Sequence, residues 1–310
     1  MAGSVRPMDE RFCKVGDVEL CYEPFGDPDR PAVLLVMGLG TQMLGWHEDF
    51  CRELAERGFF VIRYDNRDVG RSTRLDDAPT PTMPQIMTRR VKQPPYLLAD
   101  MADDGLGLLG ELGIERAHVV GASMGGMIAQ TMAARAPERV ESLVSIMSST
   151  GSRWSGQPAP RILPVFLQKP AASREDYQER LVKLFKLVGS PAFERDDDEL
   201  RELAGQAWDR GLDPHGFARQ LGAILASGNR SADLRRIEAP TLVIHGKADR
   251  LVRPSGGRAT AKAIPNAKLE LIDGMGHDLP RGIWPRILGG IEKTARRGAE
   301  RTPEPADVAG

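Results

Sequence analysis

Continuous apolar runs recur along the chain, separated by segments with apolar residues three and four positions apart. In a parallel sheet covered by helices on both faces, the strands are buried on both sides and read as such runs, whereas the covering helices show helical periodicity. The alternation therefore predicts an α/β fold with a mostly parallel, doubly wound sheet. The predicted strands are residues 32–37, 59–65, 117–121, 141–147, 241–245 and 268–272.

The segment before the first of these runs has a different pattern. Residues 12–26 alternate apolar and polar side chains, and Gly16 with Asp17 forms a turn signal between the two halves. Alternation is typical of strands with one face in solvent, and the turn predicts that the two halves pair antiparallel. We expect a hairpin at the edge of the sheet.

Between residues 151 and 232 the alternation of strands and helices stops. Prolines interrupt the first part, and amphipathic segments follow at 175–187, 198–209 and 215–226. A helical insertion here would lie above the carboxyl ends of the strands, where open α/β sheets bind ligands. We interpret it as a helical cap. Its apolar residues are expected to be mostly core, with a minority lining a pocket: Trp154, Phe166, Leu167, Phe185, Leu187, Trp208, Phe217, Leu221 and Leu225.

The 310 residues suffice for one substantial α/β core plus this insertion. The chain accordingly divides into an N-terminal core part at 1–150, the cap at 151–232 and a C-terminal core part at 233–296. Residues 297–310 combine two prolines with mixed charge, which predicts a disordered tail.

The strongest chemical signal is the pentapeptide Gly121-Ala122-Ser123-Met124-Gly125, between a predicted strand and an Ala- and Met-rich helical segment. Gly-x-Ser-x-Gly at a strand-to-helix junction is typical of a nucleophile elbow. The turn forces the serine into an unfavourable backbone conformation, and the flanking glycines avoid collisions beside it. Ser123 is therefore the predicted nucleophile, and the Met124 N–H is left free at a helix N-terminus.

A serine nucleophile needs a base, and the sequence has five histidines. His118 lies inside the strand before the elbow, and His245 lies at the end of another strand. His47 begins an amphipathic helix, and His215 is in the polar middle region. His277 follows the last predicted strand on a glycine-rich loop that can reach over the sheet, so it is the predicted base.

The base needs an orienting acid, which we expect on the loop after the penultimate strand. Asp249 occupies that loop. Asp273 and Asp278 are nearer to His277 in sequence, but neighbours on one loop rarely point at each other in the required geometry. The strand at 143–147 is another position for such an acid, and it runs into two serines and a threonine with no carboxylate.

Ester hydrolysis also requires donors for the oxyanion. The loop after the first central strand is Gly38-Leu39-Gly40-Thr41, and the N–H of Leu39 is the predicted partner of the Met124 N–H. The alternative interpretation of Gly38 and Gly40 is a simple turn.

With the chain order Ser123, Asp249, His277 in place, the sequence resembles the α/β-hydrolase superfamily over nearly its whole length. More narrowly, four segments resemble aclacinomycin methylesterase and its relatives: Leu34 to Gly38, Arg63-Tyr64-Asp65, the elbow, and Gly274 to His277. The common family form has His-Gly where this chain has Met37-Gly38. That histidine usually packs and hydrogen-bonds under the oxyanion loop, so the bracing of the loop here is left open.

Composition excludes several classes. The net charge of −1 carries no electrostatic footprint for nucleic acid, and no run approaches the roughly 18 apolar residues of a membrane span. No leader-like apolar core precedes residue 12, and the motifs for metals and nucleotides are missing. Cys13, Cys21 and Cys51 form no CxxC pair; a Cys13–Cys21 bridge is the alternative to reduced packing residues. We expect a cytoplasmic enzyme without cofactor, metal, nucleic-acid or membrane partner, whose oligomeric state is open.

These residues predict hydrolysis of a small-to-medium lipophilic ester through an acyl-enzyme. The alternatives are a cofactor-free perhydrolase resembling bacterial haloperoxidases, a C–C bond hydrolase, and, from a different class, a ligand receptor that turns over slowly. A haloalkane dehalogenase is disfavoured, since it needs an Asp where Ser123 stands.

Overall fold

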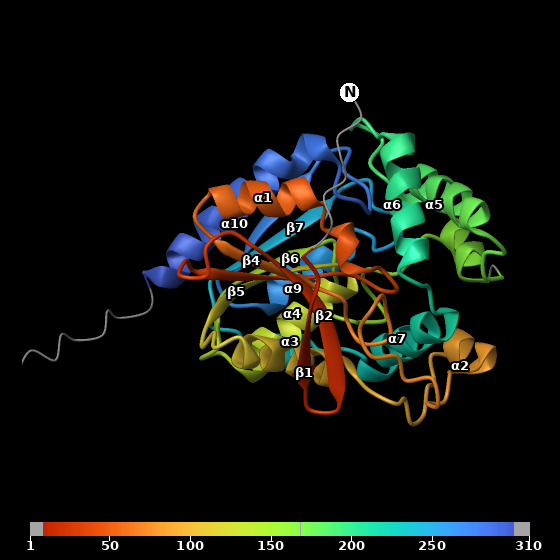
Figure 1. Cartoon of the computed structure of the whole chain (residues 1–310), viewed down its shortest axis with the longest axis horizontal. Helices are drawn as coiled ribbons and strands as arrows, with labels where there is room; N and C mark the ends of the chain where they lie inside the picture. The colour runs from red at the N-terminus through yellow and green to blue at the C-terminus, as the bar shows by residue number, and fades with distance from the viewer. Residues whose placement is uncertain (1–8, 168, 301–310) are drawn as a thin grey trace, which may run out of the picture.

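The computed structural model describes residues 9–167 and 169–300. Its centre is an eight-stranded sheet in the order β1-β2-β4-β3-β5-β6-β7-β8 (Figure 1). β1 and β2 are the predicted antiparallel hairpin at the edge. The six strands that follow β2 in this order, namely β4, β3, β5, β6, β7 and β8, each pair parallel with the next. The α/β prediction is confirmed. The strands are Arg11–Val15, Val18–Phe25, Ala32–Val36, Phe60–Tyr64, Ala117–Ala122, Val140–Ile146, Thr241–Gly246 and Lys268–Ile272, numbered β1 to β8.

The central strands are buried because both faces of the sheet are covered. In β3, Leu34 and Val36 pack into one apolar cluster, and Val33 and Leu35 pack into the other. Alternate side chains of one strand therefore supply opposite layers, which is why the run has no polar position. Helices α3 (Leu98–Glu111), α4 (Met124–Arg135), α8 (Ser231–Leu234) and α9 (Ser255–Ala263) cover the first face, and α1 (Glu48–Glu56) and α10 (Trp284–Ala299) the second.

Three longer helices lie between β6 and β7 in sequence and to one side of the sheet (Figure 1). They are α5 (Arg174–Val188), α6 (Asp197–Asp209) and α7 (Pro214–Ser227), within a residue of the predicted bounds. Shorter elements are α2 (Met83–Thr88) and the 3-10 turns Met43–Gly45, Pro160–Leu167 and Arg281–Ile283. The domain boundaries at 151 and 232 stay a prediction.

Two expectations about side chains and ends need correction. Trp154 is 87% exposed and lies in a turn, so it is no part of the cap core. α10 continues to Ala299, so an ordered helix occupies the start of the predicted tail. Residues 301–310, and the side chains of Phe166 and Leu167, lie outside the described residues.

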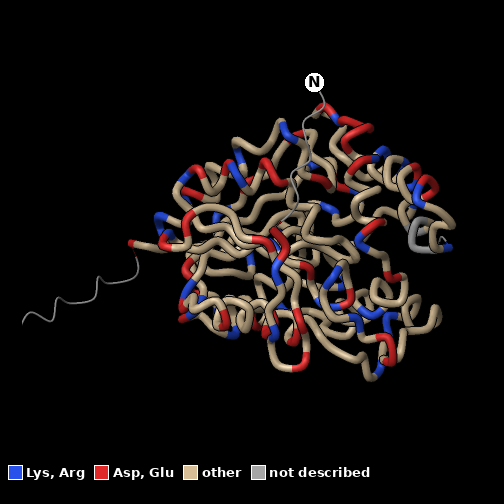
Figure 2. The backbone as a smooth tube through the Cα atoms, in the orientation of Figure 1, with Lys and Arg blue, Asp and Glu red and all other residues tan. Residues whose placement is uncertain are grey.

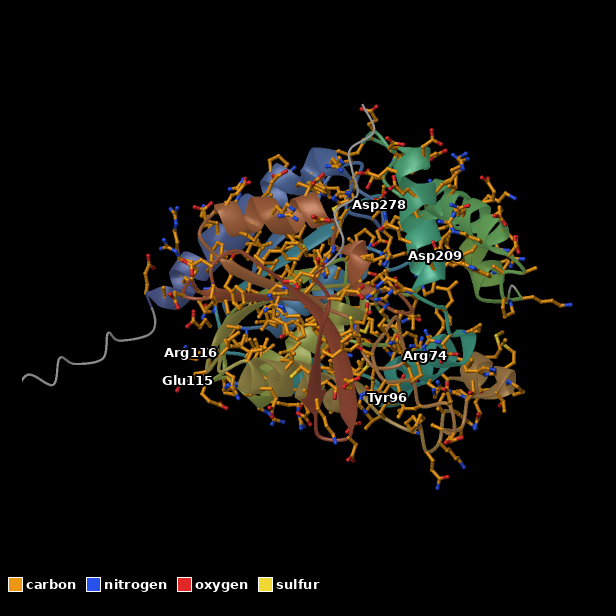
Figure 3. The ribbon with its side chains drawn as sticks, in the orientation of Figure 1. Arg74, Tyr96, Glu115, Arg116, Asp209 and Asp278 are labelled. Atoms are coloured by element: carbon orange, nitrogen blue, oxygen red, sulfur yellow. The ribbon has the colours of Figure 1, made fainter. Side chains whose placement is uncertain are left out.

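Two buried ion pairs fasten the cap helices to the core loop after β4. Arg210, at the end of α6, donates to the Asp65 carboxylate at 2.7 Å. Arg219, on α7, donates to both oxygens of Asp68 at 2.8 and 2.9 Å, and the Tyr96 hydroxyl donates to Asp68 at 2.7 Å (Tyr96 is labelled in Figure 3). Breaking a buried pair leaves an uncompensated charge, so these contacts hold the cap in one position.

The cysteines, all within the described residues, are free thiols. Cys13 is in register with Leu20, and Cys21 is in register with Phe12, so the hairpin does not bring the two sulfurs opposite each other. Burial raises the pKa of Cys21 and of Cys51 to about 12. Within residues 9–167 and 169–300, every helix is too short or too polar to cross a bilayer.

Candidate active site

Ser123 occupies the sharp turn between β5 and α4 with φ 57° and ψ −120°. A side-chain-bearing residue at positive φ stores strain, and such strain persists only where the surroundings fix it. Here the Ser123 N–H donates to the Ile146 carbonyl of β6 at 2.9 Å, which anchors the turn to the neighbouring strand. The hydroxyl is thereby held above the carboxyl ends of the strands.

The glycines on both sides of Ser123 are required by space. A Cβ on Gly121 would lie 2.1 Å from the Gly125 carbonyl oxygen, and a Cβ on Gly125 would lie 2.0 Å from the Val36 carbonyl oxygen. Both contacts are with backbone, which cannot move aside. A Cβ on Gly126 would lie 2.7 Å from the Ser148 Cβ, so this glycine lets α4 approach the end of β6 closely.

The structure brings Ser123, His277 and Asp249 into one hydrogen-bonded series. His277 Nε2 lies 3.0 Å from Ser123 Oγ, and His277 Nδ1 lies 2.7 Å from Asp249 Oδ2. Asp249 Oδ1 accepts from the N–H groups of Leu251 and Val252, each at 2.9 Å. The aspartate is therefore fixed as an acceptor, so Nδ1 of the imidazole carries a proton toward it and Nε2 is the free base facing the serine.

The other histidines are engaged elsewhere. His118 Nδ1 lies 3.0 Å from Ser142 Oγ, and burial lowers its pKa to about 4. His47 Nδ1 accepts from the Asp49 N–H in the first turn of α1, and His215 lies in the first turn of α7. His245 is nearest the site: its Nε2 lies 2.7 Å from the Val252 carbonyl oxygen and 3.5 Å from Asp249 Oδ2. His245 therefore lies near the same Asp249 oxygen that His277 contacts, but its short hydrogen bond is to the Val252 carbonyl and no contact joins it to Ser123.

The competing acids also have other partners. Asp273 is exposed and pairs with Lys247 at 2.8 Å. Asp278 is held by Ser190, whose N–H donates to Asp278 Oδ2 at 3.1 Å. Neither is hydrogen-bonded to His277. Within the described residues, no group of three or more His, Cys, Asp or Glu side chains is arranged to hold a metal ion.

The loop that carries Leu39, one predicted oxyanion donor, lies beside Ser123, and Met124, the other, follows Ser123 directly in sequence. A Cβ on Gly38 would lie 3.1 Å from Ser123 Cβ and 3.6 Å from Ser123 Oγ, so the loop after β3 passes directly beside the serine. Within the described part of the chain, the N–H groups of Leu39 and Met124 donate to no protein acceptor. Two unpartnered donors beside a nucleophile are the arrangement that stabilises a tetrahedral oxyanion.

Comparison with known proteins agrees with this geometry. The family model described as alpha/beta hydrolase fold matches residues 31–280. The chain belongs to the alpha/beta hydrolase family. The hydrolase is 32% identical over 309 residues to rhodomycin D methylesterase DauP from Streptomyces sp. (strain C5), covering 92% of this chain and 97% of that protein. It is 31% identical, with the same coverage, to rhodomycin D methylesterase DnrP from Streptomyces peucetius.

Among solved structures, the enol-lactonase from Burkholderia xenovorans LB400 has a TM-score of 0.71 and 25% identity, over 92% of the hydrolase and 100% of that chain. The 2-hydroxy-6-oxo-6-phenylhexa-2,4-dienoate hydrolase from Rhodococcus sp. strain RHA1 has a TM-score of 0.72 and 24% identity, over 94% and 99%. The second likeness shows the fold alone. The family model and the two methylesterase relatives support a serine carboxylesterase.

Sequence reasoning missed how the hydrolase braces its oxyanion loop. Gln220, fully buried on α7, accepts from the Gly40 N–H at 2.8 Å and donates to the Arg67 carbonyl at 2.7 Å. Asn66 donates to the Met37 carbonyl at 3.0 Å. A cap glutamine and a core asparagine therefore hold the loop that lacks the family histidine. Because polar residues of an amphipathic helix ordinarily face solvent, the sequence gives no indication that Gln220 points into the protein.

The histidine loop is also attached to the cap. The His277 N–H donates to the Val188 carbonyl at the end of α5 at 2.7 Å, and the Gly276 N–H donates to Ser190 Oγ at 2.8 Å. The Ser190 hydroxyl in turn donates to Asp278, labelled in Figure 3. Burial raises the pKa of Asp278, against the hydrogen bonds from Ser190 that favour its charged form. The loop of Leu39 and the loop of His277 thus both contact cap helices.

Proposed function

We propose that the hydrolase is a serine carboxylesterase that works through an acyl-enzyme. The observation that carries the proposal is the unbroken series from Ser123 Oγ through the His277 imidazole to Asp249, with distances of 3.0 and 2.7 Å. Serine becomes an effective nucleophile only when a positioned base removes its proton, and this geometry supplies one.

In the first half-reaction, His277 Nε2 accepts the Ser123 proton as Oγ attacks the ester carbonyl. Asp249 stabilises the imidazolium, and the N–H groups of Leu39 and Met124 stabilise the oxyanion. The imidazolium then protonates the departing alcohol, which leaves the acyl group on Ser123. In the second half-reaction, His277 takes a proton from water as the water attacks the acyl carbonyl. The imidazolium then returns that proton to Ser123 Oγ as the acyl–oxygen bond breaks and the acid leaves.

For the substrate, we infer a methyl ester of a bulky lipophilic acid. The support is the pair of methylesterases that match nearly the whole chain, each of them named for rhodomycin D. A methanol leaving group is small, so most contacts between substrate and protein would be made by the acyl portion. An enol-lactone, as in the Burkholderia xenovorans relative, is an internal ester and requires the same steps.

The proposal is tested by turnover of methyl esters of bulky aromatic acids, beside p-nitrophenyl esters from acetate to dodecanoate. Wild-type protein is expected to hydrolyse the methyl esters, and Ser123→Ala is expected to lower kcat by about three orders of magnitude or more. Faster consumption of a vinylogous diketone would indicate a C–C hydrolase, and peroxide-dependent bromination in acetate a perhydrolase. A burst without steady turnover would indicate a ligand receptor.

The proposal includes a cytoplasmic location, with which the buried free thiols of Cys21 and Cys51 are compatible. It includes a small-molecule ester as the substrate and no nucleic-acid partner, in keeping with a net charge of −1.

A further inference from the structure

Two segments of the chain, residues 78–99 and 142–174, contain no aspartate or glutamate. Over most of the remaining backbone, acidic and basic positions are interspersed (Figure 2). The first segment carries α2, and the second leads from β6 into the cap. In a chain with nearly balanced charge, two acid-free segments produce a local excess of positive charge wherever they meet.

The two segments do meet. The Arg89 guanidinium, at the end of α2, donates to Gln157 Oε1, and Arg253 Nε donates to the Gln157 carbonyl at 2.8 Å. Burial, together with repulsion from Arg153, lowers the pKa of Arg89. Arg153 in turn lies over the ring of Trp154, 5.9 Å from its centroid. Arg89 from the first segment and Arg153 from the second therefore lie on one surface. We call this surface, together with Arg90 and Lys92 next to Arg89 in sequence, the basic patch.

Within the described residues, no ion pair joins a carboxylate to Arg89, Arg90, Lys92 or Arg153, whereas Arg135 and Arg180, outside the two segments, pair with Asp103 and Asp176. Like charges held together without a counter-ion are costly unless an external anion neutralises them. Among the described residues of the two segments, the exposed cations with no ion pair are Arg89, Arg90, Lys92, Arg153, Arg161 and Lys169.

Large apolar side chains project among these cations. Trp154 is 87% exposed, and Met87 and Met83 on α2 are 66% and 46% exposed. Exposed tryptophan beside lysine and arginine is typical of surfaces that lie in the membrane interface, where the ring enters the headgroup region and the cations meet lipid phosphates.

We propose that the basic patch docks the hydrolase on an anionic lipid surface. Charge complementarity selects the occupant: the patch is acid-free and unpaired, and it presents isolated apolar side chains rather than the continuous apolar groove that a protein helix would fill. Pro81, shortly before α2, packs directly against Gly222 of α7. The packing is so close that a Cβ on Gly222 would lie 2.6 Å from Pro81 Cγ. Docking would thus place a cap helix next to the membrane, from which a lipophilic ester can enter.

The sequence predicts no membrane partner because it has no apolar run long enough to span a bilayer. Peripheral docking needs no such run, because the side chains reach only into the interface. The inference goes beyond ester hydrolysis and is independent of it. Binding is therefore measured on Ser123→Ala protein as well as on wild type, so that a failure of the catalytic proposal is distinguishable from a failure of docking.

The experiment is co-sedimentation with vesicles of phosphatidylcholine alone and of equal parts phosphatidylcholine and phosphatidylglycerol. Wild-type protein is expected to bind only the anionic vesicles, and less at higher salt. Each basic side chain near such a surface contributes roughly fivefold to partitioning, so a variant with Arg89, Arg90 and Lys92 changed to serine is expected to bind about a hundredfold more weakly. Trp154→Ser is expected to weaken binding without changing its salt dependence.

The matched control changes Lys262, Lys268 and Lys293 to serine, which removes the same charge from exposed positions on α9, β8 and α10. The control is expected to bind as wild type does. Equal loss in both triple variants would mean that overall charge and not the basic patch determines binding, and would overturn the proposal. Failure of wild type to bind anionic vesicles, or binding of an acidic protein such as a carrier domain instead, would also overturn it.

Discussion

Replacing Gln220 with leucine tests whether the cap sets the geometry of the oxyanion loop. Leucine keeps the approximate volume and removes both hydrogen bonds, so the Gly40 N–H loses its acceptor and the Arg67 carbonyl loses its donor. A buried donor left without a partner costs about 1–3 kcal/mol. If this cost appears in the transition state, it corresponds to a decrease of about five- to 150-fold in kcat.

An upper bound comes from the chemistry itself, since complete loss of one oxyanion donor costs about 10²- to 10³-fold in kcat. KM is expected to stay nearly constant, because the ground-state carbonyl depends less on these donors than the oxyanion does. The affinity for a trifluoromethyl ketone, which mimics the oxyanion, should fall in parallel with kcat. A role of Gln220 in stability alone would lower neither.

The assay is steady-state hydrolysis of a methyl ester, with thermal unfolding measured on the same samples. The control is Gln178→Leu, which removes a cap hydrogen bond from Gln178 to the Arg201 carbonyl, between α5 and α6 and away from the loop. The control should keep its kcat. The reasoning is refuted if Gln220→Leu retains wild-type kcat, or if both variants lose activity equally.

Three further predictions follow from buried groups. Burial lowers the pKa of His118 from 6.5 to about 4, although Glu141 lies 3.3 Å from its Nε2, so the unfolded chain takes up the proton first. Stability should fall as the pH drops from 6.5 toward 4, by up to roughly 3 kcal/mol, and His118→Gln should flatten this dependence in urea titrations at several pH values. Arg219→Met leaves the Asp68 carboxylate buried without its arginine partner and should lower the free energy of unfolding by about 3–5 kcal/mol. A loss below about 1 kcal/mol, of the order of a surface ion pair, would contradict the conclusion that this pair fastens the cap to the core. Gly125→Ala should yield little folded, active protein, because its Cβ would lie 2.0 Å from a backbone oxygen of β3; normal circular dichroism with normal turnover would contradict that spacing.

Sequence patterns predicted the sheet well because a strand buried on both faces has no polar position. The five residues of β3 are all buried, and the predicted run at 32–37 overlaps them. Ser123, Asp249 and His277 could be selected because each follows a strand at the same edge of the sheet. That topological argument needs no knowledge of side-chain directions.

Polar contacts between cap and core could not be predicted in this way. Gln220 and Arg219 lie on an amphipathic helix, where a polar residue is ordinarily assigned to solvent. Their partners, the Gly40 N–H and the Asp68 carboxylate, are far away in sequence, so no local pattern connects the two sides of each contact. Trp154 is one of nine apolar cap residues expected to be mostly core, because most aromatic residues are buried, and its exposure of 87% departs from that general tendency.

The central claim is that His277 activates Ser123 for covalent attack. The most direct measurement is mass spectrometry of the protein after treatment with a fluorophosphonate, which phosphonylates activated serines. One adduct is expected, on the peptide that contains Ser123, and it should disappear in His277→Ala protein that retains its fold. An adduct on a different residue, or labelling of Ser123 at the same rate without the imidazole, would contradict the account.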